Sequence, residues 1–247
     1  MRILKEEIIK SKIRVQKHGE VFTPKKIVNK MLEIYEIKEA CENIFKKFLE
    51  PSAGEGAFLI AILQKKLEKV EKDYNNNLAQ FENYSLLALT TLYGIELLKD
   101  NAQTCVMNLF QTYYDFYQKQ AMHHNNKVKK KVLNSAKEII SANIEQGNFL
   151  TRRRSDGTPL IFSEWLPVNF KKNAKNIKIQ RTEYTLDEIY KDAKKQLGQN
   201  ISTSLKQDNQ LNIFDLLEDD ESEIKFTEMR YTVVFIVDIY KVEMEEI

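Results

Sequence analysis

The stretch EPSAGEGAF, residues 50–58, places a carboxylate and a two-glycine loop directly in front of an apolar helix. Before it, residues 44–49 predict a short buried strand. After it, apolar residues recur at helical spacing: Phe58, Leu59, Ile62, Leu63 and Leu67. Gly54 and Gly56 therefore lie at a predicted strand-to-helix turn, where the missing Cβ lets a ligand approach backbone amides at the helix N-terminus. Such a loop favours a carboxylate or a phosphate, and no Gly-Lys-Ser/Thr follows it, which excludes a Walker phosphate loop.

A second signal lies about thirty residues upstream, in GEVFTP at residues 19–24. Apolar residues then recur at helical spacing, which predicts a helix over residues 25–35. We expect Thr23 to be its N-cap and Pro24 to occupy its first position. Another helix is expected over residues 3–14.

Together these two stretches resemble the amino-group DNA methyltransferases, especially the adenine-N6 modification subunits of restriction-modification systems. In that family both elements contact S-adenosylmethionine, and here both occur in the family's order. The resemblance implies that S-adenosylmethionine is the cofactor. It also implies a set of cofactor-binding residues in the two stretches: Phe22, Thr23, Pro24, Glu50, Pro51, Gly54, Gly56 and Phe58.

A third match to the family is YGIELL at residues 93–98, which predicts the end of a second strand. The resemblance implies that Glu96, with Leu97 beside it, binds the cofactor, the carboxylate accepting hydrogen bonds from the ribose hydroxyls. The alternative is an ordinary surface glutamate. Glu96 follows Gly56 by forty residues, against about twenty in a dinucleotide-binding unit, so we expect an extra helix over residues 78–92 and no nicotinamide cofactor.

A fourth match is IEQGNFL at residues 144–150, after a predicted third strand. Family members usually place Asp where Asn148 stands, to accept a hydrogen bond from the adenine amino group of the cofactor. Asn148 can accept through its side-chain oxygen, without a charge. Phe149 either packs on the purine face or belongs to the core.

No clear motif for the methyl acceptor is present. The family holds the flipped-out amine with (Asp/Asn/Ser)-Pro-Pro-(Tyr/Phe), whereas the four prolines of this chain, Pro24, Pro51, Pro159 and Pro167, are never adjacent. The nearest counterpart is Asp238 with Tyr240, at the end of a possible fourth strand over residues 231–237. Cytosine-C5 methylation is excluded because neither Cys41 nor Cys105 follows a proline. The catalytic residues therefore stay unassigned.

Composition agrees with a cytoplasmic globular protein. The chain has 247 residues, 43% of them hydrophobic, and its two cysteines give no reason to expect a disulfide framework or a zinc site. We expect no membrane span, because no run of about eighteen apolar residues occurs, and the first residues are too charged for a signal peptide. His123 and His124 lack carboxylate or cysteine neighbours at ligand spacing, so no metal is expected.

Charge is unevenly distributed along the chain, although the net charge is only +2. Residues 119–181 hold 14 Lys/Arg against 4 Asp/Glu, whereas residues 182–247 hold 7 against 16. The basic part suits a phosphate backbone, and Arg152 to Arg154 directly follow the predicted third strand, where ligands of α/β sheets gather. A solvated surface is the alternative for this basic part. Residues 216–223 are read as an acidic linker, or as a surface for a basic partner.

The resulting prediction is an α/β fold, a doubly wound Rossmann-like S-adenosylmethionine-dependent methyltransferase with N-terminal helices and an irregular C-terminal insert. Residues 1–150 would form the N-terminal helices and the cofactor-binding half. Residues 151–247 would be an insert and a strand-rich segment, completing or appended to the same domain. Within them, Thr185 and Glu188 predict a capping box that begins a helix reaching about residue 197.

The predicted function is that of a DNA methyltransferase of the adenine-N6 class, from a restriction-modification or phage-defence system, which acts on DNA. The alternative is a catalytically inactive subunit that binds S-adenosylmethionine or DNA and acts with a partner chain. That partner would be a methyltransferase, a specificity subunit or a nuclease.

Overall fold

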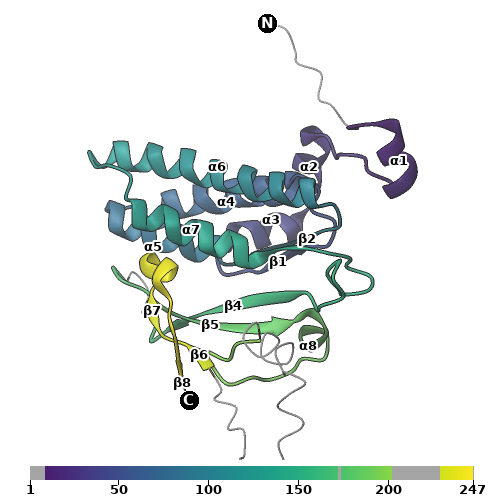
Figure 1. Ribbon diagram of the computed structural model, residues 1–247. Coiled ribbons are helices and arrows are strands. Elements are labelled where there is room, and N and C mark those ends of the chain that lie inside the picture. Colours follow the sequence, from purple (N-terminus) through teal and green to yellow (C-terminus); the bar gives the residue numbers. More distant parts are fainter. Residues whose placement is uncertain (1–8, 172–173, 202–228, 247) are drawn as a thin grey trace, which may run out of the picture.

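A computed structural model describes residues 9–171, 174–201 and 229–246 (Figure 1). The described part is an α/β structure, in which a parallel sheet lies between a layer of helices and an antiparallel sheet. The helices are α1 (Lys12–His18), α2 (Lys25–Leu32), α3 (Tyr35–Glu42), α4 (Ala57–Asp73), α5 (Leu78–Leu89), α6 (Lys99–His123), α7 (Lys130–Asn143), α8 (Leu186–Tyr190) and the 3-10 helix η1 (Ile236–Lys241). The strands are β1 (Phe48–Glu50), β2 (Leu92–Glu96), β3 (Ile144–Gln146), β4 (Ile161–Val168), β5 (Lys178–Thr185), β6 (Met229–Tyr231), β7 (Val234–Phe235) and β8 (Met244–Glu246).

The three parallel strands lie in the order β1-β2-β3, with Leu49 opposite Tyr93 and Ile95 opposite Glu145. Strand β1 is shorter than the predicted 44–49, because Asn43 forms a turn first. Its side chain accepts a hydrogen bond from the Phe45 amide at 2.9 Å, and its carbonyl accepts one from the Lys46 amide at 3.1 Å. The chain therefore becomes extended only at Phe48.

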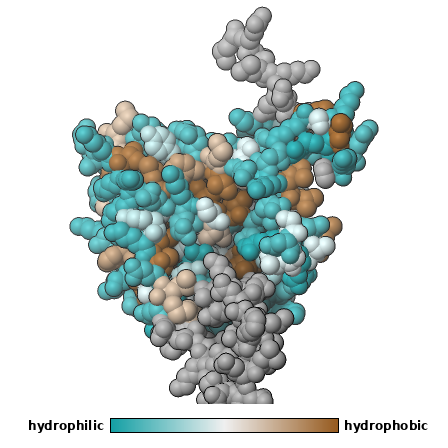
Figure 2. Space-filling view, in the orientation of Figure 1, coloured by the Kyte–Doolittle hydropathy of each residue, from teal (hydrophilic) through white to brown (hydrophobic). Residues whose placement is uncertain are grey.

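Helices cover one face of this sheet (Figure 1). Gly94 allows their close approach, because a Cβ on it would lie 2.9 Å from Leu59 Cδ1 of α4. On α6, Tyr113 and Tyr117 are fully buried in the main core. The Tyr117 hydroxyl donates to Glu82 of α5 at 2.5 Å. Figure 2 shows a largely hydrophilic exterior on the side facing the viewer, with apolar patches over the helical layer.

The other face is covered by strands, where a doubly wound sheet would carry helices. The antiparallel sheet has the order β4-β5-β7 and lies against the parallel sheet (Figure 1). Tyr93 donates a hydrogen bond from its hydroxyl to the Ser163 carbonyl at 2.9 Å, and Ile95 packs with Leu160 and Phe162. Residues 160–162 form a short continuous apolar run that follows the turn residues Asp156 and Gly157, and this segment returns as strand β4.

The C-terminal segment does not form the expected fourth strand of the parallel sheet. The apolar run over residues 231–237 is divided between β6, the two-residue β7 and the start of η1. Strand β7 pairs with β5, and η1 packs on α5 and α7. Ile236 and Trp165 belong to the same buried cluster as Leu59 of α4, so the two halves of the sequence share one core.

Four helix predictions were wrong at their ends. Helix α5 ends at Leu89 rather than at residue 92, and α2 ends at Leu32 rather than at residue 35. Ser11, not a residue before position 3, is the N-cap of α1, and residues 3–8 lie outside the described residues. Pro24 rather than Thr23 is the N-cap of α2. The capping box of Thr185 and Glu188 is confirmed, but α8 ends at Tyr190. The acidic residues 216–223 also lie outside the described part of the chain.

No helix among the described residues is long and apolar enough to cross a membrane.

Lys66 of α4 is fully buried beside the amino ends of the parallel strands. Its ammonium group donates to the Lys46 carbonyl at 2.7 Å, to Thr91 Oγ1 at 2.8 Å and to the Asn43 carbonyl at 3.1 Å. Burial lowers the pKa of Lys66 from 10.5 to about 7, because the charged form is poorly solvated there. One helix position thus joins the start of β1 to the start of β2.

Lys66 makes folding stability depend on pH. Between pH 7 and 10.5 the unfolded chain holds a proton on Lys66 that the folded chain has lost, so stability should rise with pH. The expected slope is about 1.4 kcal/mol per pH unit. Urea unfolding at pH 7, 8 and 9 should show this rise for the wild type relative to Lys66→Met. The exposed Lys72→Met is the control. Parallel curves for the wild type and Lys66→Met would contradict this assignment.

Candidate cofactor site

The carboxyl ends of β1 and β2 meet at the glycine loop. Gly54 has φ +55° and Gly56 has φ +93°, conformations that favour glycine. Gly56 is the N-cap of α4, and no side chain caps that helix. The first-turn amides of α4 thus lack a side-chain acceptor, as in helix N-termini that bind anions.

Glu96, at the end of β2, holds this loop in place. Its Oε2 accepts a hydrogen bond from the Gly54 amide at 2.8 Å, and its Oε1 accepts one from the Leu98 amide at 2.9 Å. The residue is 7% exposed. Since a carboxylate has about four lone-pair positions, each oxygen can still accept one further hydrogen bond. Two neighbouring hydroxyl groups of a ligand fit this capacity.

The predicted FTP element lies beside the same loop. A Cβ on Gly54 would be 3.7 Å from Phe22 Cδ1, so the Phe22 ring covers Gly54. Thr23 and Pro24 follow it and are partly buried. The two sequence stretches that carry the resemblance are therefore brought together in space.

Helix α6 contributes residues that sequence reasoning missed. A Cβ on Gly56 would lie 2.9 Å from Cys105 Sγ, and Asn108 donates to the Glu55 carbonyl at 3.0 Å. Asn101 precedes them on the same face, at positions i, i+4 and i+7, a period that marks one side of a helix. Burial, with Glu96 and Glu50 nearby, raises the pKa of Cys105 to about 12, so its thiol stays protonated at neutral pH.

Asn148 uses its side-chain oxygen within its own loop. Oδ1 accepts hydrogen bonds from the Leu150 amide at 2.8 Å and the Thr151 amide at 3.3 Å. The acceptor role expected toward adenine therefore competes with two backbone amides. Phe149 is partly buried and packs on the cluster of Ile95 and Phe162.

The remaining predicted cofactor residues are Glu50, Pro51, Phe58 and Leu97. Glu50 accepts a hydrogen bond from the Ser52 amide at 3.2 Å. Pro51 and Leu97 are exposed, whereas Phe58 is partly buried against the main core. Glu50 and Leu97 end or directly follow strands, so they lie at the same edge as Glu96.

The three consecutive arginines form ion pairs. Arg152 and Arg153 share Asp187, at 2.8 and 2.9 Å, and Arg154 contacts Glu145 at 2.6 Å. Because the single carboxylate of Asp187 pairs with two guanidinium groups, Arg152, Arg153 and Asp187 together keep a net positive charge. The net positive charge around the three arginines is therefore smaller than their sequence alone suggests.

Asp238 and Tyr240 lie far from the glycine loop. Asp238 pairs with Lys131 near the start of α7, at 3.4 Å. That helix then runs 14 residues before β3, which is about 20 Å at 1.5 Å per residue. We therefore do not propose these residues as a replacement for the missing acceptor motif.

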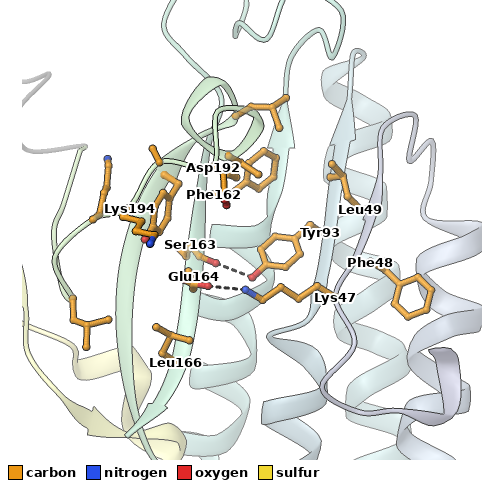
Figure 3. Close-up of a pocket in the computed structure, with 16 residues that line it drawn as sticks. Lys47, Phe48, Leu49, Tyr93, Phe162, Ser163, Glu164, Leu166, Asp192 and Lys194 are labelled. Carbon is orange, nitrogen blue, oxygen red and sulfur yellow. Dashed lines mark hydrogen bonds and ion pairs between the residues drawn. The ribbon is translucent and has the colours of Figure 1, made fainter.

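A separate cavity of about 620 Å³ lies between the parallel sheet and the β4–β5 hairpin (Figure 3). Leu49, Tyr93 and Phe162 line it, and Lys47 pairs with Glu164 across it at 2.8 Å. None of the predicted cofactor residues lines this cavity. Within the described ranges, no group of three His, Cys, Asp or Glu side chains is placed to hold a metal ion.

Comparison with known proteins agrees with the arrangement of these motifs. The family model described as N-6 DNA Methylase matches residues 8–188, more than half of the chain. The chain belongs to the N-6 DNA methylase family. No curated protein and no solved structure matches it. The N-6 DNA methylase match includes Phe22, the glycine loop, Glu96 and Asn148, and it ends within α8, before Asp238.

Gly56 should tolerate alanine less well than a glycine with free space. Gly56→Ala adds a strained φ and a contact with Cys105, and should cost about 2–4 kcal/mol of unfolding free energy. Gly157→Ala is the control, since Gly157 also has positive φ but a Cβ added to it would meet no atom within 4 Å. It should cost about 1 kcal/mol. Equal losses in urea unfolding would show that Cys105 does not crowd the loop.

Proposed function

We propose that this N-6 DNA methylase family member binds S-adenosylmethionine at the glycine loop and acts as a DNA methyltransferase of the adenine-N6 class. A restriction-modification or phage-defence system is the proposed setting. The observation that carries the proposal is the Glu96 carboxylate, which holds Gly54 and keeps lone pairs for two hydroxyls. We further propose that β1, β2 and β3 are part of a Rossmann-like sheet.

The residues at this edge fit the parts of S-adenosylmethionine. The amides at the start of α4 suit its carboxylate, Glu96 suits its ribose hydroxyls, and Phe149 or Leu97 offers apolar surface for its purine. When bound, the cofactor supplies an electrophilic methyl group. The residues of the chain orient this methyl group toward the acceptor. Cys105 does not compete as an acceptor, because its buried thiol stays protonated.

A second candidate function is that of a subunit that needs a partner chain to bind the acceptor base. Two observations favour it. No Pro-Pro-aromatic motif occurs, and β1 pairs on one edge only among the described residues. The exposed apolar side chains of Leu49, Ile189 and Leu197 line the cavity that β1 borders. A partner strand could bind there. Radiolabelled methyl transfer to mixed DNA, with and without neighbouring gene products, distinguishes the two functions.

The cofactor proposal predicts that the chain binds S-adenosylmethionine or its demethylated product. Glu96→Ala should weaken binding about tenfold or more, because it removes a charged acceptor of the ligand and releases the Gly54 amide. The exposed Glu36→Ala should bind as the wild type does. Titration calorimetry is the measurement. No heat with either ligand would refute the cofactor site.

The DNA proposal predicts an affinity that falls as salt rises. Arg152→Gln with Arg153→Gln should weaken it, because these residues follow the Asn148 loop at the cofactor edge and share one carboxylate. Lys127→Gln with Lys130→Gln removes the same charge at the far end of α7 and should have little effect. Gel-shift titrations in which both pairs behave alike would remove the arginines from the DNA surface.

A further inference from the structure

The segment before α2 is tied to the cofactor site by a network of charged groups. Here "the strap" means residues 10–22. Lys10 Nζ contacts Glu55 Oε1 at 2.7 Å, within the glycine loop, and donates to Asn101 Oδ1 at 2.6 Å. It also lies 5.6 Å from the centre of the Phe22 ring. One lysine thus touches the loop, α6 and the aromatic ring that covers Gly54.

The second connection runs through Arg14 and Glu20. Arg14 donates to Glu20 through Nε and Nη2, and its Nη1 donates to Asp100 Oδ2 at 2.9 Å. Asn101 Nδ2 donates to Glu20 Oε1 at 2.6 Å. The Arg14 guanidinium lowers the pKa of Glu20 and lowers that of Asp100 to about 2, so both carboxylates stay charged at neutral pH.

Burial separates this network from ordinary surface ion pairs. Asn101 is 1% exposed, and it uses both ends of its amide, accepting from Lys10 and donating to Glu20. The Glu20 side chain is 6% exposed. Such partly buried, mutually satisfied hydrogen bonds fix geometry more firmly than exposed pairs do. Glu20 stands three residues before Thr23, so the network fixes the start of the FTP element.

We infer that Lys10, Arg14 and Glu20 are positioning residues for the cofactor: they tie the strap to Glu55 and Asn101 and so hold Phe22 over the glycine loop. This inference rests on the proposed cofactor site. A ligand between Phe22 and the loop gains its full contact only when the strap is in place. When the strap opens in some of the molecules, the apparent affinity equals the intrinsic affinity multiplied by the fraction of molecules that stay closed.

The test is the affinity for S-adenosylhomocysteine, measured by calorimetry at 50 and 500 mM NaCl. Lys10→Met should weaken binding about tenfold at low salt, which corresponds to about 1.4 kcal/mol. Lys10→Arg keeps the charge and should restore most of the affinity. Lys12→Met and Lys17→Met remove the same charge from exposed positions of α1 and should bind as the wild type does.

Salt dependence separates positioning from a merely structural role. Wild-type affinity should fall between the two salt concentrations, because exposed parts of the network such as Asp100 are screened. Lys10→Met should show a smaller fall. If Lys10→Met lowers the thermal midpoint of the ligand-free chain, Glu20→Gln replaces it. This change keeps the size of the side chain but puts an NH2 group, which cannot accept, in place of one oxygen that accepts from Arg14 or Asn101.

The outcomes separate the two proposals. If the wild type binds and Lys10→Met and Glu20→Gln bind equally well with the same salt dependence, the positioning role is refuted and the cofactor site stands. If the wild type binds neither S-adenosylmethionine nor S-adenosylhomocysteine, the proposed function fails, and this inference fails with it.

Discussion

The Glu96 carboxylate joins the two parts of the chain that carry the family's motifs. It accepts from Gly54 in the loop after β1 and from Leu98 at the start of α6, so β2 fixes both neighbours. This bonding needs a carboxylate, because one group must accept from two amides and still have capacity for a ligand. It also needs Gly54 and Gly56 at positive φ. The Glu96 carboxylate thereby connects the loop before α4 to the start of α6.

Local features of the sequence predicted much of this correctly. The second strand, the extra helix before it and the capping box at Thr185 each depend on residues close together in the chain. The end of the second strand at Glu96 could be predicted because the YGIELL motif itself includes the end of that strand. The glycine loop was recognisable for the same reason, since its two glycines and the following helix are contiguous.

Other features could not be predicted, because they depend on contacts between distant residues. Strands β4 and β5 cover the second face of the parallel sheet. No pattern in the sequence indicates that the chain returns across that face as an antiparallel pair of strands. Arg152 and Arg153 looked free until Asp187, more than thirty residues on, was placed beside them. The Asn43 turn that shortens β1, and the Lys10 contacts with Glu55 and Asn101, are likewise visible only in three dimensions.

We propose that the glycine loop, rather than the cavity between the parallel sheet and β4–β5, holds S-adenosylmethionine. Ultraviolet cross-linking with S-adenosyl-[methyl-³H]methionine, followed by peptide mapping, compares the two places directly. We expect label on Phe22, on residues 50–58 or on residues 96–98, with loss of label when S-adenosylhomocysteine competes. Competed label confined to residues 161–168 and 184–197, which border the cavity, would contradict it.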